Sequence, residues 1–547
     1  MSNSNNTRIK QENLTQDDIE RIYDELILAI TSPLFIDICE QLGIPDVKET
    51  IEQTNHQEDK KDIAEHLYNE LVKKHSEKFF KELNKKECQT VLKLMESHFK
   101  KQIAGQDELL HMLLIALTLN EHALLEGLPG VGKTVIVKWI AHVTGLPFSR
   151  IQFIPDMLPS DLIGKDRIIL ERLQRRDPRG ATEWVNGPVF SSLVLADEIN
   201  RAPSKVQAAL LEAMGENQVT PFGKTARSIY NNIHAAVLKV WQNKSDTNDT
   251  KDRGIFGLPS IPIQRSDLAQ FTVFATMNPI EQEGTYPLSE AQIDRFCFKI
   301  VVPYPSRYRY EEISKIMLSQ EKKIDAIEGK LPVEKYEQFF NKQGYHYMIP
   351  VLIPIYFFLR CRSYIIPVFM GEQDEKNKGK DNNMYQEKHL EEGNTLYEKF
   401  HKNQEVVVHK LHDIVFMTNA KSVSAGYAGS MRSHFELEQI EMYDYIEDEE
   451  NKRNYMDRYQ KLKDIFDLPQ CQFTLAGASP RGLASLEIAT LCETFIRGSD
   501  SVEPCHITAV IKNVLRHRIH MDVHARLAGI TSSDVIENVC SIILREK

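Results

Sequence analysis

Residues 123–143 read ALLEGLPGVGKTVIVKWIAHV, and this stretch decides the fold class. Its centre, GLPGVGKT, fits the phosphate-loop pattern GxxxxGK followed by Ser or Thr, between a strand-like run and a helical one. Glycines let successive backbone N–H groups point into one concavity, and the following helix N-terminus adds the positive end of its dipole. We therefore expect a nucleotide site, with a structural glycine turn as the alternative. The predicted nucleotide-binding residues are Gly127, Leu128, Pro129, Gly130, Val131, Gly132, Lys133 and Thr134.

From about residue 100 the chain alternates short apolar runs with helical patterns. The runs at 122–127, 193–199, 271–278 and 297–302 are bounded by glycine or acidic residues. Strands that alternate with helices are typical of a domain with a mainly parallel sheet. The predicted fold class is therefore α/β.

Polar residues at the ends of two of these runs carry candidate chemistry. Asp197 and Glu198 end the run LVLA; a strand-end aspartate can hold the Mg²⁺ shell, and an adjacent glutamate can polarise a water for in-line attack. The alternative is an acidic pair that caps the next helix. Asn278 ends the run FTVFATM and could orient the attacking water, although Asn before Pro279 is also a common turn former.

These motifs, in this order, resemble the MoxR family of AAA+ ATPases. The resemblance is carried by GLPGVGKT, ADEINRAPSKVQAALLEAMGENQVT, ATMNPIEQEGTYPLSEAQIDRF and GASPR, together with RIQFIPDMLPSDLIG, WVNGPVF and VLRHRI. It covers residues 100–310 densely and residues 472–530 more thinly. It implies an AAA+ P-loop core, in which helices flank a parallel sheet, followed by a helical lid.

The resemblance also implies roles at the nucleotide. Residues 127–134 correspond to the Walker A loop, in which Lys133 reaches the outer phosphates and Thr134 ligates Mg²⁺. Asp197 and Glu198 correspond to Walker B, with Asp197 as the second magnesium ligand and Glu198 as the catalytic residue. The implied cofactors are ATP and Mg²⁺.

Asn278 corresponds to the first sensor, and two arginines complete the implied catalytic set. Arg295, in IDRF, matches the arginine finger that reaches the neighbouring subunit's nucleotide. Its alternative is structural, an Asp294–Arg295 pair that closes a helix. Arg481, in GASPR, matches the second sensor, which contacts the γ-phosphate of its own subunit. Arg201 is a further interface candidate whose role the motifs leave open.

The resemblance further implies an assembly and a class of activity. Family members form rings, usually hexamers, and act as chaperone-like remodellers that often work with a partner carrying a von Willebrand factor A domain. We expect a homo-oligomeric ring, a hexamer, with such a partner and a protein client. The motifs identify neither the client nor the partner.

The chain extends beyond the family's usual length at several points, which suggests client or partner surfaces of its own. The long separation between Thr220 and Phe271 and the stretched lid between Pro305 and Gly477 are departures from the family pattern. The predicted organisation is a helical N-terminal accessory region at 1–98, an AAA+ domain at 99–305 with insertions near 160–188 and 221–268, and a helical lid at 306–547 with a charged insertion near 371–400.

The composition indicates the cellular location of the protein and excludes some classes of binding partner. The chain has 547 residues, a formal net charge of −11 and eight cysteines without a CxxC pair. These features argue against general nucleic-acid coating and against a disulfide scaffold, and the N-terminus lacks a secretory pattern. We therefore expect a cytoplasmic protein. The apolar stretch 349–359 is too short to span a bilayer, and we expect a buried segment in which Pro350, Pro354 and Pro367 break the helix.

The sequence also offers alternatives to this function. A nucleic-acid-stimulated AAA+ motor is the main alternative, because the 160–188 insertion holds five arginines: Arg167, Arg172, Arg175, Arg176 and Arg179. A non-hydrolysing scaffold is disfavoured by the complete catalytic set. A zinc site at His517, His520 and His524 lacks a completing ligand, and Cys505 with His506 lacks a third group for nucleophilic catalysis.

Overall fold

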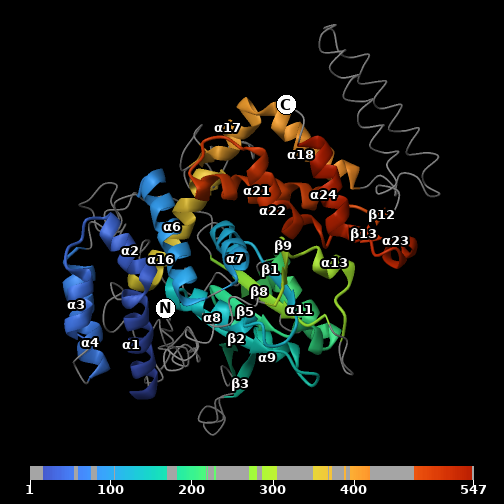
Figure 1. The fold of residues 1–547 in the computed structure, drawn as a ribbon. Coiled ribbons are helices and arrows are strands. Elements are labelled where there is room, and N and C mark those ends of the chain that lie inside the picture. Colours follow the sequence, from blue (N-terminus) through green and yellow to red (C-terminus); the bar gives the residue numbers. More distant parts are fainter. Residues whose placement is uncertain are drawn as a thin grey trace, which may run out of the picture.

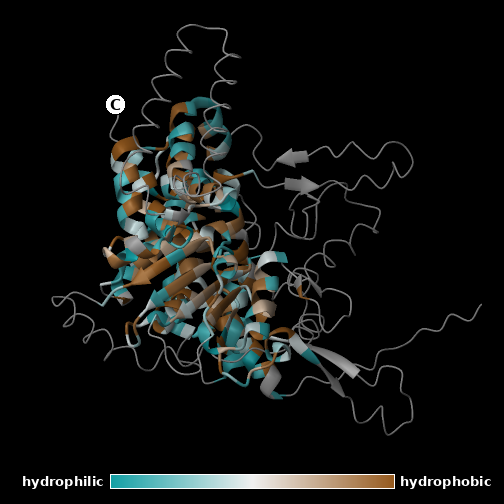
Figure 2. Ribbon diagram, turned by 90° about the vertical axis from the view of Figure 1, so that its right-hand side faces the viewer, coloured by the Kyte–Doolittle hydropathy of each residue, from teal (hydrophilic) through white to brown (hydrophobic). Residues whose placement is uncertain are grey.

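The structure is a computed structural model (Figure 1). Coloured by hydropathy, its apolar residues concentrate on the strands and on the inward faces of the helices (Figure 2). It describes residues 16–54, 59–75, 83–103, 105–168, 182–216, 218–219, 227–228, 270–279, 286–304, 349–367, 369–371, 387–389, 395–418 and 474–544.

A five-stranded parallel sheet forms the centre of the fold, as the alternating pattern predicted. Its strands are β1 (Ala123–Gly127), β2 (Phe148–Gln152), β5 (Leu193–Asp197), β8 (Thr272–Met277) and β9 (Phe298–Val302). Their order across the sheet is β2-β5-β8-β1-β9, and every pairing is parallel. The carboxyl ends of all five strands therefore meet at one edge, with β8 between β1 and β5.

The two faces of this sheet support two hydrophobic clusters. Successive residues of a strand point to opposite faces; Leu124 and Val194 belong to one cluster, whereas Leu125 and Leu195 belong to the other. The first cluster packs against α11 (Ser204–Glu216). The second packs against α7 (Asp107–Leu119) and α8 (Lys133–Thr144). Burial on both faces explains why the strands read as continuous apolar runs.

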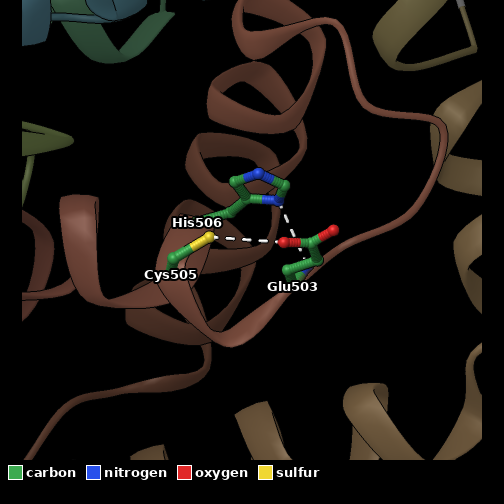
Figure 3. A group of neighbouring side chains, drawn as sticks. All are labelled: Glu503, Cys505 and His506. Carbon is green, nitrogen blue, oxygen red and sulfur yellow. Dashed lines mark hydrogen bonds between the residues drawn. The ribbon is translucent and has the colours of Figure 1, made fainter.

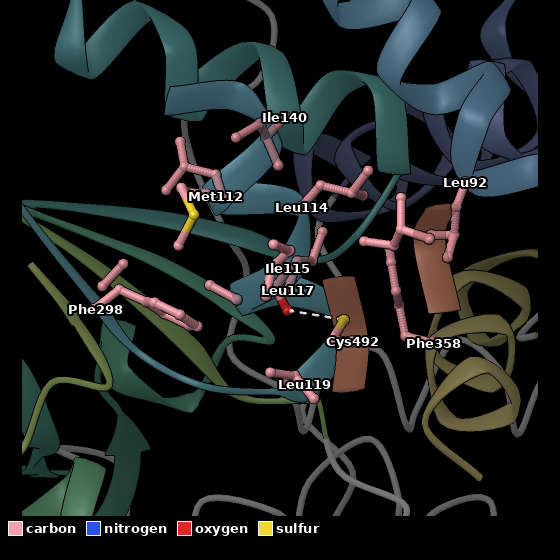
Figure 4. Close-up of a cluster of buried hydrophobic side chains, with 14 of the residues drawn as sticks. Leu92, Met112, Leu114, Ile115, Leu117, Leu119, Ile140, Phe298, Phe358 and Cys492 are labelled. Carbon is pink, nitrogen blue, oxygen red and sulfur yellow. Dashed lines mark hydrogen bonds between the residues drawn. The ribbon is translucent and has the colours of Figure 1, made fainter. Parts of the chain in front are cut away.

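The N-terminal helices extend the second cluster. They are α1 (Gln16–Thr31), α2 (Pro33–Gln41), α3 (Val47–Thr54), α4 (Lys60–Leu67), the π-helical turn η1 (Tyr68–Lys73) and α6 (Lys85–Gln102). Their periodic apolar positions, such as Ile22, Phe35 and Leu92, are buried together with residues of α7 and α8. Figure 4 shows Leu92 beside Phe358 and Cys492, which come from helices remote in sequence.

The apolar stretch near residue 350 forms a helix, α16 (Ile349–Ile365), and the prediction that its prolines break it at Pro354 is wrong. Pro350 lies in the first turn, where no N–H partner is needed, and Pro354 removes one hydrogen bond from a helix buried against α1, α6 and α7. Among the described residues no helix is long and apolar enough to cross a membrane. The expected buried segment is confirmed.

Among the described residues from 395 onward, the predicted lid consists of helices and one short strand pair, β12 with β13. Its elements are α17 (Leu396–Asn403), α18 (Glu405–Met417), β12 (Thr474–Ala476), α21 (Pro480–Arg497), α22 (Pro504–Leu515), β13 (His520–Met521), α23 (Val523–Leu527) and α24 (Ser532–Ile543). Helix α21 packs against α22, α7 and α6, so the lid shares its core with the sheet and the N-terminal helices. Residues 396–400, at the end of the predicted charged insertion, lie in α17.

Small elements complete the described parts. They are α9 (Pro159–Ile163), 3₁₀ turns η2 (Pro188–Phe190) and η3 (Ile199–Arg201), α13 (Glu290–Ile293), and the antiparallel pairs β3 (Gly164–Ile168) with β4 (Thr182–Asn186), β6 (Gln218–Val219) with β7 (Arg227–Ser228), and β10 (Phe369–Gly371) with β11 (Glu387–His389). Most of the predicted insertions at 221–268 and 371–400, and Arg172, Arg175, Arg176 and Arg179, lie outside the described residues.

Candidate nucleotide-binding site

The phosphate loop leaves the carboxyl end of β1 and enters α8 at Lys133. Gly130 and Gly132 have φ values of +80° and +82°, which favour glycine, and a Cβ at either would meet nothing within 4 Å. The loop therefore borders open space. Gly127 is required for a different reason: a Cβ there would lie 2.8 Å from the carbonyl oxygen of Val302 on β9.

Lys133 is the first residue of α8, and its side chain reaches back across the phosphate loop. Its ammonium donates to the carbonyl oxygen of Gly127 and, at 3.1 Å, to that of Met277 at the end of β8. Burial lowers the pKa of Lys133, and the carboxylates of Asp197, Glu198 and Glu126 act in the opposite direction. A cation held by neutral carbonyls beside open space is well placed to meet a phosphate.

Asp197 links the phosphate loop with the two neighbouring strands. Its Oδ2 accepts from the Thr134 hydroxyl at 3.0 Å, and its Oδ1 accepts from the Thr276 hydroxyl at 2.6 Å. Asp197 is buried at the end of β5. The predicted magnesium ligands Thr134 and Asp197 are thus adjacent, although they lie far apart in sequence.

Arg150 on β2 is a part of the site that the sequence reasoning did not single out. Its Nη2 lies 2.9 Å from Asp197 Oδ2 and 2.7 Å from Gln152 Oε1. Gln152 in turn donates to Glu198 Oε2 at 3.0 Å. The sequence signal was the pair Arg150 and Gln152 in the strand FSRIQ. Residues two positions apart on a strand point to the same face, so these two polar side chains share one face.

Glu198 adopts a left-handed backbone conformation, with φ of 57°. Its N–H donates to the Thr276 hydroxyl at 2.8 Å, which fixes the turn after β5. Its carboxylate pairs with Arg201 at 3.0 Å and forms no capping hydrogen bond, so the capping interpretation is wrong. Strained backbone at a non-glycine residue is concentrated at functional sites.

Asn278 lies directly after β8, the strand between β1, which the phosphate loop follows, and β5, which Glu198 follows. Its carbonyl oxygen accepts from Asn200 Nδ2 at 3.3 Å. The sheet order therefore brings the predicted first sensor to the same edge as both Walker motifs. Its action on a water stays a prediction.

The two predicted arginines contact protein groups outside the phosphate loop. Arg295 donates from Nη1 to the carbonyl oxygen of Leu211 on α11. Arg481, with 61% of its side chain exposed, lies 3.9 Å from Asp294 Oδ2. Asp294, which ends α13, also accepts from Arg518, and the structural alternative for Arg295 stays a prediction. The finger and sensor roles stay predictions.

Two of the three histidines considered for zinc, His517 and His520, have separate partners, and the side chain of His524 lies outside the described part of the structure. His517 Nε2 donates to the carbonyl oxygen of Phe296 at 3.0 Å, and His520 pairs with Glu290 at 3.1 Å.

Cys505 and His506 lie together with Glu503 at the start of α22 (Figure 3). His506 Nδ1 accepts from the Glu503 N–H at 3.1 Å and lies 3.1 Å from the Thr494 hydroxyl oxygen. The arrangement is a helix cap, and its imidazole nitrogen is committed to that cap.

Comparison with known proteins agrees with this geometry. The family described as "ATPase family associated with various cellular activities (AAA)" matches residues 122–261 and 260–298. The protein named Chaperone MoxR1 of Mycobacterium tuberculosis is 44% identical over 214 residues, which are 39% of this chain and 45% of that protein. The matched part of the chain resembles the AAA+ ATPase domain of the MoxR family. The matched residues contain the phosphate loop, Asp197, Glu198 and Asn278.

Two further relatives match part of the chain. The protein YeaC of Bacillus subtilis is 38% identical over 45% of this chain and 61% of its own length. Protein MoxR of Methylorubrum extorquens is 28% identical over 38% of this chain and 49% of its own. The chain thus spans about half the length of these curated relatives. A solved structure from Cytophaga hutchinsonii covers 87% of this chain and 98% of its own, with 24% identity and a TM-score of 0.49.

The residues present fit Mg²⁺ and a nucleotide. A hydroxyl and a carboxylate are oxygen ligands that Mg²⁺ prefers, and it commonly binds through one or two protein groups plus substrate phosphates. Thr134 and Asp197 supply this set beside a loop that borders open space.

Proposed function

We propose that the chain is an ATPase that hydrolyses ATP to ADP and phosphate at this site. The observation that carries the proposal is the hydrogen-bonded group of Thr134, Asp197 and Thr276 at the edge of the sheet, beside Lys133 and Glu198. It unites a phosphate-binding cation, an oxygen ligand set and a carboxylate base within one small region. The family that this part of the chain resembles supports the same activity.

The chemistry assigns one task to each group. Lys133 and the loop N–H groups hold the β- and γ-phosphates, and Thr134 and Asp197 hold Mg²⁺, which neutralises charge on those oxygens when bound. Glu198 accepts a proton from water as the water oxygen bonds to the γ-phosphorus and the bond to the bridging oxygen of ADP breaks. Asn278 orients that water.

The two arginines complete the site from different subunits. Arg295 of one subunit stabilises charge at the neighbour's γ-phosphate, while Arg481 contacts the γ-phosphate bound by its own subunit. This arrangement requires a homo-oligomer, for which a hexameric ring is the proposed form. Within the ring, hydrolysis drives chaperone-like remodelling of a protein client, together with a von Willebrand factor A domain partner, in the cytoplasm. The name of the Mycobacterium tuberculosis relative supports the chaperone part.

Phosphate release by purified variants tests the catalytic assignment. Glu198→Gln should retain ATP binding and slow hydrolysis by about 10²-fold or more, as expected for loss of a general base. Glu216→Gln, on the exposed end of α11, is the matched control and should leave turnover unchanged. Near-normal turnover of Glu198→Gln would overturn the assignment of the base. Stimulation of the wild-type ATPase by DNA or RNA would favour a nucleic-acid motor instead of a protein remodeller.

A mixing experiment tests the shared site. Arg295→Ala and Glu198→Gln chains should each be nearly inactive alone. In mixed rings, some interfaces combine an intact Glu198 with a neighbour's intact Arg295, and these should hydrolyse ATP. Mixed rings without activity, confirmed as mixed on native gels, would overturn the action of Arg295 on a neighbouring subunit.

A further inference from the structure

The residues that follow α22 contact the segment that carries Arg295. His520 pairs with Glu290 at 3.1 Å, and His517 Nε2 donates to the Phe296 carbonyl oxygen at 3.0 Å. Between these two contacts lies Arg518, whose side chain is 2% exposed. Residues 517–520 thus contact the segment 290–297 at several points along its length.

Arg518 places its guanidinium between this segment and helix α21. Its Nε donates to Asp294 Oδ1 at 2.7 Å, which is a charged pair that is almost completely buried on the arginine side. Its Nη1 donates to the carbonyl oxygens of Val514 (2.6 Å) and Cys297 (3.1 Å). Its Nη2 has three acceptors within reach of its two N–H groups: the carbonyl oxygens of Phe296 (3.0 Å) and Asp294 (3.4 Å) and the Ser485 hydroxyl (3.3 Å). A guanidinium has five N–H donors in a fixed plane, so this set of acceptors leaves it one orientation.

The same guanidinium is packed against the start of the helix that carries Arg481. A Cβ on Gly482 would lie 3.0 Å from Arg518 Cδ and 3.0 Å from Ala478 Cβ, so the helix and the arginine are in close contact. Asp294 also lies 3.9 Å from Arg481 Nη1. Asp294 is therefore shared between a buried arginine of the lid and the exposed arginine of α21.

We propose that Arg518, through Asp294, is a positioning residue that holds the Arg295 segment and the Arg481 helix as one rigid unit. The proposal rests on the proposed function, because it concerns how the two arginines are placed. It goes beyond that function by assigning a role to two residues that contact no nucleotide. When nucleotide in one subunit draws Arg481 toward its γ-phosphate, the rigid unit moves Arg295, which serves the neighbouring site.

Loss of the contact between Arg518 and Asp294 should lower kcat more than it lowers the affinity for ATP. Asp294→Asn keeps the shape of the side chain and removes the charge shared by the two arginines. We expect kcat to fall by about 10- to 100-fold with little change in ATP affinity, since a displacement of about 1 Å at a catalytic group costs on the order of 10²-fold. Gly482→Ala is the second variant: it removes no charge and displaces Arg518, and kcat should fall in the same direction. Arg526→Lys, in the same lid with its Nε on the Met521 carbonyl oxygen, is the matched control.

Mixed rings separate positioning from a general folding defect. Asp294→Asn chains mixed with Glu198→Gln chains should regain activity, because an intact Glu198 then meets a correctly held Arg295 from the neighbour. A merely misfolded Asp294→Asn chain could not contribute an active site and would not be rescued.

The outcomes distinguish this proposal from the one on which it rests. If Arg295→Ala is rescued by Glu198→Gln and Asp294→Asn is not, the shared site stands and the positioning role is wrong. The role is also wrong if both Asp294→Asn and Gly482→Ala match the wild-type kcat. If the wild-type chain releases no phosphate from ATP, it is the proposed function that fails.

Discussion

His111 on α7 joins three parts of the chain, and its removal should weaken the fold in a pH-dependent way. Its Nε2 lies 2.5 Å from Glu493 Oε2 on α21, and its Nδ1 lies 3.5 Å from Glu96 Oε1 on α6. Arg497 pairs with Glu493, and Lys100 pairs with Glu96. The N-terminal helices, the sheet domain and the lid therefore meet at one imidazole.

The magnitude follows from the pKa of His111. Burial lowers this pKa, but the hydrogen bonds with Glu493 and Glu96 outweigh burial and raise it from 6.5 to about 9. At 1.36 kcal/mol per unit, this rise corresponds to about 3 kcal/mol of stability. Because the folded-state pKa exceeds the unfolded-state value, that stability is fully present below pH 6.5 and is lost as the pH rises through about 9.

The perturbation is His111→Gln, which keeps a hydrogen-bonding side chain and removes the charge. At pH 6 the free energy of unfolding should fall by about 3 kcal/mol relative to wild type, and this difference should shrink toward zero above pH 9. Urea unfolding followed by far-UV circular dichroism at several pH values measures it. His409→Gln, at an exposed histidine of α18, is the control and should change stability by less than about 0.5 kcal/mol. An equal difference between His111→Gln and wild type at pH 6 and pH 9.5 would refute the reasoning.

Three further outcomes are expected. Lys133→Ala should lose ATP binding by calorimetry, because it removes the cation of the phosphate loop, and unchanged affinity would contradict the loop assignment. Chelation of Mg²⁺ with EDTA should abolish phosphate release and added Mg²⁺ should restore it, whereas full activity in EDTA would exclude a magnesium role for Thr134 and Asp197. Phe358→Ala should lower the free energy of unfolding by about 3–5 kcal/mol, because Phe358 is 0% exposed in the cluster of Figure 4. A loss below about 1 kcal/mol would contradict this prediction, since it would mean that the surrounding side chains fill the cavity.

The sequence by itself determined the features that depend on neighbours along the chain. The glycine spacing of the phosphate loop, the apolar runs that became β1, β5, β8 and β9, and the periodic positions of α1 and α6 are local patterns. The polar residues at the ends of those runs were also readable, because parallel strands present their carboxyl ends at one edge. The resemblance to the MoxR family followed from several such motifs in order.

The tertiary structure alone decided which remote residues meet. Arg150 pairs with Asp197 because β2 and β5 are neighbours, and strand order is not encoded in either strand's own pattern. Helix α16 continues through Pro354 because surrounding helices bury it, so packing outweighs the loss of one hydrogen bond. Arg518 reaches Asp294 across more than 200 positions of sequence. Contacts of this kind depend on how the helices and strands pack in three dimensions, and no local pattern of residue types records that packing.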